Sequence, residues 1–173
     1  MKRLLALIAI GAVIAFGHAQ DTGVTDDQII IGNWGPQSGP AAAWGTVSTA
    51  VEAYFQYLND QGGIHGRELV LATRDDGYDP ARTVAAVREL IDSVGVFAFA
   101  AGVGTANGLA ALPLIQREGV PWIGPASGSE EFANNSSGLI CATFTDYEAE
   151  AVLMTRHAVT ELGSKNIAIF YQN

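Results

Sequence analysis

The sequence has little of what several classes of protein require. Its 173 residues include one cysteine, which excludes an intramolecular disulfide framework and a multi-cysteine metal site. Nine Lys and Arg stand against 18 Asp and Glu, so the chain has no basic excess for binding nucleic acid. Only 16% of the residues are charged and 49% are hydrophobic, which excludes intrinsic disorder. The composition is that of a globular protein that binds no nucleic acid.

The first 19 residues have the layout of a secretory signal peptide. Lys2 and Arg3 precede an uninterrupted apolar run over residues 4–16, and small residues before Ala19 mark a cleavage site. The run is too short to cross a bilayer, which needs about 20 apolar residues. We therefore predict cleavage near Ala19 and a mature chain that is periplasmic or secreted.

Behind this leader, strand-like apolar runs alternate with segments of helical period. We expect strands over residues 28–32, 68–73, 96–101, 120–124, 139–143 and 166–171. We expect helices over residues 43–58, 80–94, 105–118 and 147–162, and a short helical turn over residues 127–132. Apolar strands separated by helices form a mostly parallel sheet with helices on both faces. The predicted fold class is therefore α/β, a doubly wound, mostly parallel sheet.

Helix starts are marked by small polar residues. Asp79 and Pro80 predict an N-cap and the first helical residue. Thr105 is expected at an N-cap position. Ser127 and Thr145 each stand three residues before a glutamate, which is typical of a capping box. The cysteine, Cys141, lies within an apolar strand, so we expect its thiol to be buried and unreactive.

In such a sheet, ligands bind at the carboxyl ends of the strands. The loops expected there are residues 35–44, 75–79, 102–105 and 125–129. Each loop leads into a helix start, where free backbone N–H groups and the helix dipole attract anions. We therefore expect the ligand site among these four loops.

Nucleotide and metal sites are not indicated. Gly102-Val103-Gly104 follows a strand, but residue 107 is Asn where the dinucleotide fingerprint needs glycine. Asp75, Asp76 and Asp79 lack the spacing of a calcium loop, and Asp79 already serves as a cap, so we interpret them as solvated loop carboxylates. We predict no cofactor and no metal.

A catalytic set is not indicated either. Ser127 follows a strand, but the glycines near it are not spaced as in a nucleophile elbow. Behind the leader the histidines are His65 and His157, and no pattern places either one near Ser127. We therefore predict a protein without catalytic residues.

What remains is a set of hydroxyls and free amides at helix starts, with one aromatic ring. Thr105 has no glutamate three residues on, so its hydroxyl is a candidate contact for an anionic group of a ligand. Ser127 and Ser129 offer the same chemistry one loop later. Trp44, just past a Gly/Pro loop, is a candidate wall for an apolar part of the ligand. These residues favour the binding of a small molecule.

A series of short motifs makes the chain similar to a known family. The series is Gln37-Ser-Gly-Pro40, Trp44-Gly45, Leu58-Asn-Asp-Gln-Gly-Gly-Ile64-His-Gly66, Asp75-Asp76 with Asp79-Pro80, Glu118-Gly-Val-Pro121 and Gly124-Pro-Ala-Ser-Gly-Ser129. Each motif is weak alone, but their order and spacing are specific. The set resembles the solute-binding proteins of branched-chain amino acid ABC transporters, the leucine/isoleucine/valine-binding type of periplasmic binding protein.

The resemblance implies two lobes that clamp an amino acid or related amide, without catalysis, and a membrane permease as partner. It implies that Trp44 bounds the pocket and that Thr105 holds the ligand carboxylate. Further contacts are implied for the loop residues Ser127, Gly128 and Ser129, and for Asp146 and Tyr147 at the start of the second lobe. Residues 20–141 would form the N-terminal lobe. Residues 142–173 would form the crossover and the truncated start of the second lobe.

Two other readings of the sequence stay open. One is a ligand-sensing receptor domain of the same fold, and the less favoured one is a hydrolase. The intact protein is expected to be a monomer. The chain as it stands, with an incomplete second lobe, is expected to bind weakly and to be poorly soluble.

Overall fold

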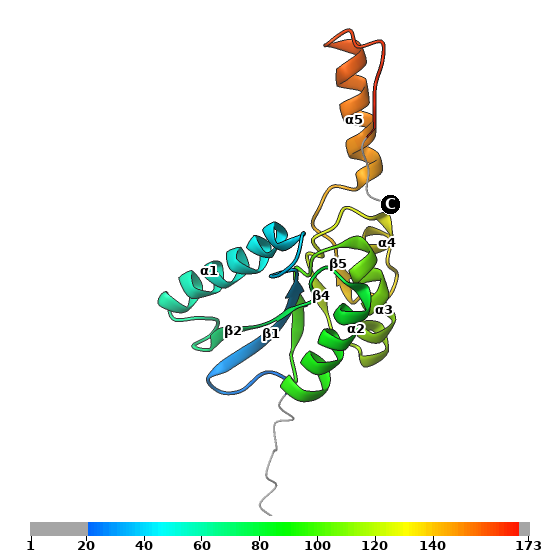
Figure 1. Cartoon of the computed structure of the whole chain (residues 1–173). Coiled ribbons are helices and arrows are strands. Elements are labelled where there is room, and N and C mark those ends of the chain that lie inside the picture. The colour runs from blue at the N-terminus through cyan, green and yellow to red at the C-terminus, as the bar shows by residue number, and fades with distance from the viewer. Residues whose placement is uncertain (1–20, 170–173) are drawn as a thin grey trace, which may run out of the picture.

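Five parallel strands alternate with helices in residues 21–169, the part of the chain that the computed structural model describes (Figure 1). The strands are β1 (Gln28–Gly35), β2 (Glu68–Asp75), β3 (Ala98–Ala100), β4 (Trp122–Ile123) and β5 (Ile140–Cys141). The helices are α1 (Thr46–Asp60), α2 (Pro80–Glu89), α3 (Thr105–Glu118), α4 (Glu130–Ala133) and α5 (Tyr147–Thr160). A 3₁₀ turn, Ala42–Gly45, leads into α1, and a π-helical turn, Leu90–Val94, ends the second helical segment. The predicted leader, residues 1–19, lies outside the described residues.

The sheet has the order β2-β1-β3-β4-β5, and all of its pairs are parallel. The chain runs outward from β1 to β2 and then returns past β1 to β3, so the order reverses between β1 and β3. Because crossovers between parallel strands are right-handed, this reversal places α1 on one face and α2 and α3 on the other (Figure 1). The predicted α/β class, a doubly wound parallel sheet, is confirmed.

The core lies between the sheet and the helices α2, α3 and α4. Trp34 on β1, Phe99 on β3 and Trp122 on β4 are fully buried there. The ring of Trp34 lies 5.3 Å from that of Phe99 and 4.9 Å from that of Trp122, between centroids. Phe132 of α4 packs edge-on against Trp122. Aromatic edge contacts of this kind give a small core a fixed geometry.

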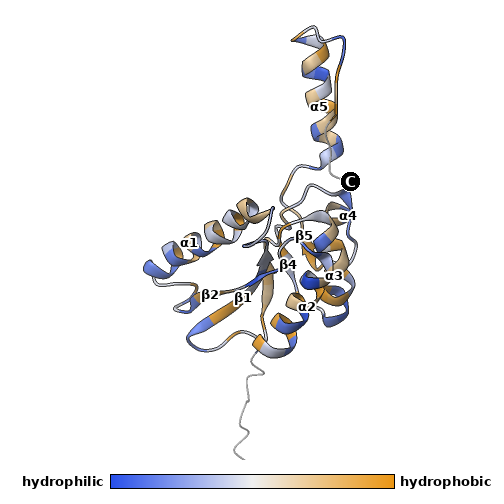
Figure 2. Cartoon of the chain, in the orientation of Figure 1, coloured by the Kyte–Doolittle hydropathy of each residue, from blue (hydrophilic) through white to orange (hydrophobic). Residues whose placement is uncertain are grey.

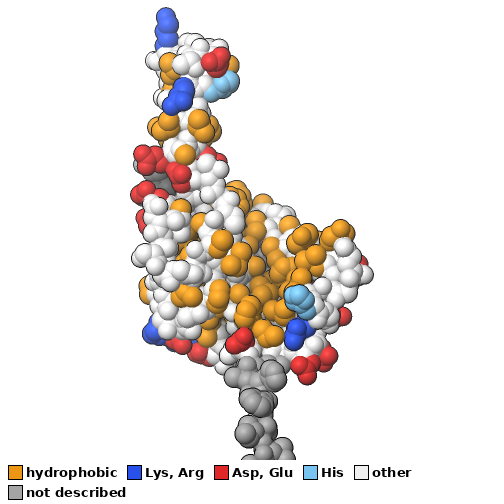
Figure 3. Space-filling view, turned by 180° about the vertical axis from the view of Figure 1, so that it is seen from behind, with side chains coloured by type: hydrophobic (Ala, Val, Ile, Leu, Met, Phe, Trp, Pro, Cys, Tyr) orange, Lys and Arg blue, Asp and Glu red, His pale blue; other side chains and the backbone are white. Residues whose placement is uncertain are grey.

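On the opposite face of the sheet, α1 covers β2 and β1, and the side chains of β4 and β5 are exposed. Trp122 is fully buried, whereas its neighbour Ile123 is 48% exposed, because successive side chains of a strand point to opposite faces. Figure 3, the view from behind, shows a broad group of hydrophobic side chains on the surface. Cys141 pairs with Ile123 and is exposed, so the prediction of a buried thiol was wrong. The apolar neighbours of Cys141 did not reveal that its strand lies at the edge of the sheet with one face uncovered.

The helix α5 stands away from the sheet, and none of its residues is buried (Figure 1). Hydrophobic and hydrophilic residues alternate along it (Figure 2), and Leu153 and Met154 are largely exposed. Its N-cap is Asp146, whose Oδ1 accepts a hydrogen bond from the Ala149 N–H at 2.7 Å. The predicted capping box at Thr145 was therefore misplaced by one residue, because the chain stays extended through Asp146.

The strand expected over residues 166–171 is absent from its described part. Residues 166–169 have no strand partner, and Ile167 and Ile169 are exposed. A β-strand needs a neighbour to receive its hydrogen bonds, and the described chain supplies none there; residues 170 and 171 lie outside the described residues. Between residues 21 and 169, no helix is both long enough and apolar enough to span a bilayer.

Candidate functional site

The parallel sheet brings the predicted loops together at its carboxyl edge. The loop after β1 is joined to the end of β2, where the Gln37 N–H and the Ser38 hydroxyl donate to the Asp75 carboxylate at 2.8 and 2.5 Å. The loop after β3 is joined to the loop after β4, where the Ala126 N–H donates to the Gly102 carbonyl at 3.0 Å. The Val103 N–H of the third loop donates to the Trp34 carbonyl of β1 at 3.3 Å, so the four loops form one continuous edge.

At the centre of this edge, two predicted residues meet. The hydroxyl oxygens of Thr105 and Ser127 lie 2.7 Å apart. The pair has two hydroxyl hydrogens and uses one between its members, so the other remains for a ligand acceptor. Ser127 is 4% exposed and its oxygen also accepts the Ser129 N–H at 3.1 Å. The pair is thus held in place and keeps one donor to spare.

Thr105 is the first residue of α3 and not its cap, which corrects the prediction. The N-cap is Gly104, with φ 103° and ψ 133°. A threonine at the cap position would be strained at this φ because its Cβ would meet the backbone, whereas glycine has no Cβ. No side chain caps α3, so the N–H groups of its first turn have no side-chain acceptor. These groups and the spare hydroxyl hydrogen are the donors that an anionic ligand group requires.

Ser127 does not form the predicted capping box. The N-cap of α4 is Ser129, and α4 begins at Glu130, three residues later than the turn expected from Ser127. The side-chain hydroxyl of Ser129 bonds to Glu131. The Ser127 hydroxyl is hydrogen bonded to Thr105 and to the Ser129 N–H, so it lies at the edge of the sheet and does not cap α4.

Gly128 connects the edge to the start of α5. Its carbonyl accepts the Tyr147 N–H at 2.8 Å, and a Cβ at Gly128 would lie 2.6 Å from the Thr145 carbonyl oxygen and 2.8 Å from the Tyr147 ring. A hollow of about 230 Å³ lies beside this contact. It is lined by Gly128, Ser129, Glu130, Glu131, Tyr147 and Glu148. Tyr147 thus borders the loop, whereas the carboxylate of Asp146 is engaged in capping α5.

Trp44 lies apart from the hydroxyl pair. It belongs to the 3₁₀ turn after β1, and 63% of its surface is exposed. Among the described residues, no hydrogen bond or ring contact joins it to Thr105 or Ser127. A second hollow of about 350 Å³, between this turn, α1 and β2, is lined by its neighbours Gly45 and Thr46. Trp44 therefore presents an open ring at the rim of the edge.

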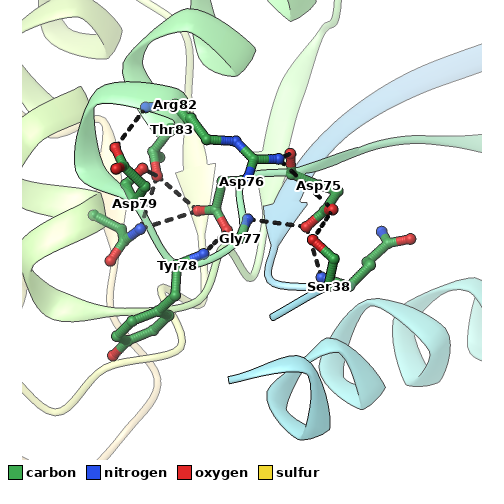
Figure 4. Close-up of polar contacts among 10 residues, drawn as sticks. Ser38, Asp75, Asp76, Gly77, Tyr78, Asp79, Arg82 and Thr83 are labelled. Carbon is green, nitrogen blue, oxygen red and sulfur yellow. Dashed lines mark hydrogen bonds and ion pairs between the residues drawn. The ribbon is translucent and has the colours of Figure 1, made fainter. Parts of the chain in front are cut away.

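Three aspartates, at the last residue of β2 and in the loop that follows it, have three different roles (Figure 4). Asp79 caps α2 by accepting the Ala81 and Arg82 N–H groups, which confirms the predicted start of that helix. The Asp75 carboxylate accepts from Ser38, from the Gln37 N–H and from the Gly77 N–H, and these bonds lower its pKa from 3.8 to about 2. The Arg82 guanidinium, 3.7 Å away and 55% exposed, adds little beside them.

Asp76 was wrongly predicted to be solvated. It is fully buried and accepts hydrogen bonds from the Tyr78 N–H, the Thr83 hydroxyl and the Asn107 side-chain amide. Side chains alternate at the end of a strand, so two consecutive aspartates had to point to opposite faces. One face is covered by α2 and α3. That alternation was the signal in the sequence that could have found this cluster.

Metal-ligand geometry is not present in the described part of the chain, where no three His, Cys, Asp or Glu side chains are grouped to hold an ion. Fold and edge together define an α/β domain in which the uncharged donors at Thr105 and Ser127 can hold a small molecule with an anionic group.

A model of the family described as periplasmic binding protein matches residues 28–173, so the chain belongs to that family. A Leu/Ile/Val-binding protein homolog 3 from Brucella melitensis is 24% identical over 170 residues, which are 98% of this chain and 45% of that protein. The chain thus spans less than half the length of this relative.

Two solved structures have the same fold. A fatty acid ABC transporter substrate-binding protein from Thermomonospora curvata has a TM-score of 0.76 and 26% identity, covering 85% of this chain and 37% of that one. A substrate-binding periplasmic protein from Ralstonia solanacearum has a TM-score of 0.72 and 29% identity, covering 78% of this chain and 38% of that one. These relatives are substrate-binding proteins.

Proposed function

We propose that this chain is the N-terminal part of a periplasmic receptor that delivers a branched-chain amino acid, or a related small amide, to an ABC importer. The observation that carries the proposal is the Thr105–Ser127 hydroxyl pair, 2.7 Å apart at the uncapped start of α3. The spare hydroxyl hydrogen and the free N–H groups would bind the ligand carboxylate. Residues 20–141 would form the first lobe, after cleavage of the leader near Ala19.

The remaining proposed contacts surround this pair. Gly128 and Ser129 would line the pocket through their backbone, and Tyr147 would close it where the chain leaves the lobe. Trp44 would cover the apolar end of the ligand when the two lobes close, which accounts for the open position of its ring. Residues 142–173 would lead into the second lobe. A ligand shifts the balance between open and closed forms only by contacting both lobes.

The Leu/Ile/Val-binding relative from Brucella supports an amino acid as the ligand. The fatty acid substrate-binding protein from Thermomonospora makes a fatty acid the competing class of ligand. Both ligands have a carboxylate that the hydroxyl pair could hold, so the α-ammonium group of the amino acid and the length of the apolar end distinguish them. The proposed protein binds without catalysis, acts as a monomer and docks on a membrane permease.

Isothermal titration of the full-length gene product tests the proposal. We expect saturable binding of leucine, isoleucine or valine, and none of lauric acid. The 173-residue chain alone should bind these amino acids much more weakly, because it spans less than half the length of the Brucella relative and a ligand held by two lobes would lose many of its contacts. Binding of lauric acid without any amino acid, or hydrolytic turnover of a small amide, would reject the proposal.

A further inference from the structure

A buried carboxylate lies directly behind the binding edge. Asp76, one residue past β2, accepts hydrogen bonds from the Tyr78 N–H at 2.9 Å, the Thr83 hydroxyl at 2.6 Å and the Asn107 side-chain amide at 3.1 Å. No cation lies within ion-pair distance of it among residues 21–169. A buried charge without a counter-ion costs stability unless hydrogen bonds satisfy it. The carboxylate therefore needs all three donors.

These donors come from three different segments of the chain. Tyr78 belongs to the loop after β2, Thr83 to α2 and Asn107 to the first turn of α3. The Thr83 hydroxyl also accepts from the Asn107 amide at 2.8 Å, which closes a ring of three buried side chains. Figure 4 shows Asp76 and Thr83 facing each other on the side of the loop away from Ser38. The ring thus ties the start of α3 to α2 and to β2.

We propose that Asp76 is a positioning residue for the ligand-binding hydroxyl of Thr105. Asn107 is two residues beyond Thr105 in the same helical turn, and no side chain caps that turn. The bond from Asn107 to Asp76 therefore sets where the turn begins, and with it the 2.7 Å approach of Thr105 to Ser127. This inference rests on the proposed function, in which that pair holds the ligand carboxylate.

A carboxylate suits this position better than an amide. Its two oxygens accept every hydrogen bond, whereas an amide has one acceptor oxygen and brings an NH₂ group that faces other donors. Asp76→Asn should therefore loosen the start of α3 without changing the size of the side chain. Adding Asn107→Asp should restore the pairing, since the carboxylate then stands on the other side and accepts from the introduced amide and from Thr83.

Asp79 provides the matched control. It lies three residues away in the same loop and also accepts backbone hydrogen bonds, but only from α2. Asp79→Asn changes the same functional group and leaves the start of α3 untouched. It should therefore affect the melting temperature alone.

The experiment uses the full-length gene product, with leucine titration and with hydrogen exchange at residues 108–111, the first hydrogen-bonded N–H groups of α3, measured without ligand. We expect Asp76→Asn to weaken leucine binding about tenfold and to speed exchange at those residues. The double variant should recover both properties. Asp79→Asn should change neither. A folded Asp76→Asn variant with unchanged affinity and exchange would overturn the proposal, and so would a double variant that recovers neither property.

Two further outcomes are separated by the same design. If the unsubstituted protein binds none of leucine, isoleucine and valine, the proposed function fails, while the exchange comparison still decides whether Asp76 orders α3. If Asp76→Asn does not fold, Thr83→Val removes one donor while keeping the side-chain shape. Thr83→Val should then show the faster exchange at residues 108–111, and unchanged exchange in it would refute the positioning role.

Discussion

Thr105 and Ser127 are 22 positions apart in the sequence, yet their hydroxyl oxygens lie 2.7 Å apart. They meet because β3 and β4 are adjacent in the sheet and the loops that follow them are hydrogen bonded to each other. Because Gly104 is the N-cap of α3, Thr105 is the first residue of the helix and not its cap. The contact is therefore a product of sheet order and of one glycine.

The hydroxyl pair should be the main determinant of carboxylate binding. We expect Thr105→Val or Ser127→Ala in the full-length gene product to weaken leucine affinity by about 1.5–3 kcal/mol each, the value of a hydrogen bond to a charged group. The double variant should lose less than the sum, because the two residues share a bond. Isothermal titration measures the effect. Thr160→Val, on the exposed surface of α5, is the control and should bind as the unsubstituted protein does.

Adjacent residues of β4 should differ sharply in their effect on stability. Trp122→Ala removes a fully buried ring from the aromatic core and should lower the free energy of unfolding by about 3–5 kcal/mol. Ile123→Ala, at a side chain 48% exposed on the open face, should cost about 1 kcal/mol or less. Urea denaturation of the 173-residue chain compares the two. Equal losses would show that the open face is packed in solution.

Stability should fall in acid through Asp75. Its pKa is lowered in the folded chain to about 2 from 3.8, first by the Ser38 hydroxyl and then by the Gln37 and Gly77 N–H groups. The folded state therefore binds this proton more weakly than the unfolded state does. The stabilisation is complete above pH 3.8 and is lost as the pH falls toward about 2.

The urea concentration at the midpoint of denaturation, measured between pH 5 and pH 2, tests the contribution of Asp75. Asp75→Asn should remove its share of the decline in that window, and Ser38→Ala should reduce it. A decline that is as steep in Asp75→Asn as in the unsubstituted chain would assign the acid sensitivity to other carboxylates.

Gly128 should tolerate no side chain. In Gly128→Ala the new Cβ would lie 2.6 Å from the Thr145 carbonyl oxygen, so the start of α5 has to move. We expect a loss of about 1–3 kcal/mol, as for other overpacked sites. Gly138→Ala is the comparison, since its Cβ meets nothing within 4 Å and the cost is that of a left-handed alanine, about 1 kcal/mol. Thermal denaturation and the Tyr147 amide chemical shift report the two effects.

Helix starts show where prediction from sequence succeeds and where it stops. Asp79-Pro80 marked the start of α2 correctly, because the capping side chain and the proline ring act within one turn. The same local rules misplaced the caps at Thr105, Ser127 and Thr145. In those cases Gly104, Ser129 and Asp146 have the cap geometry, since a loop that packs against a neighbour decides which residue first becomes helical.

Burial shows the same division. The apolar runs identified the five strands of the sheet but also indicated one over residues 166–171 whose described part is not a strand, and they did not show that the face of the sheet carrying Cys141 is open. Two consecutive aspartates looked alike in the sequence. In the fold, the Asp75 carboxylate accepts hydrogen bonds from the loop after β1, whereas Asp76 is buried against α2 and α3.

Periodicity and short-range chemistry, read from the sequence alone, determined the order of strands and helices, the parallel sheet and the four loops at its edge. These follow from hydrogen bonding and burial within a few residues. Tertiary structure alone decided that Thr105 meets Ser127, that Asp76 reaches Asn107 and that Trp44 stands apart. Such contacts join segments more than 20 residues apart, and their distances depend on strand order and packing that no local pattern contains.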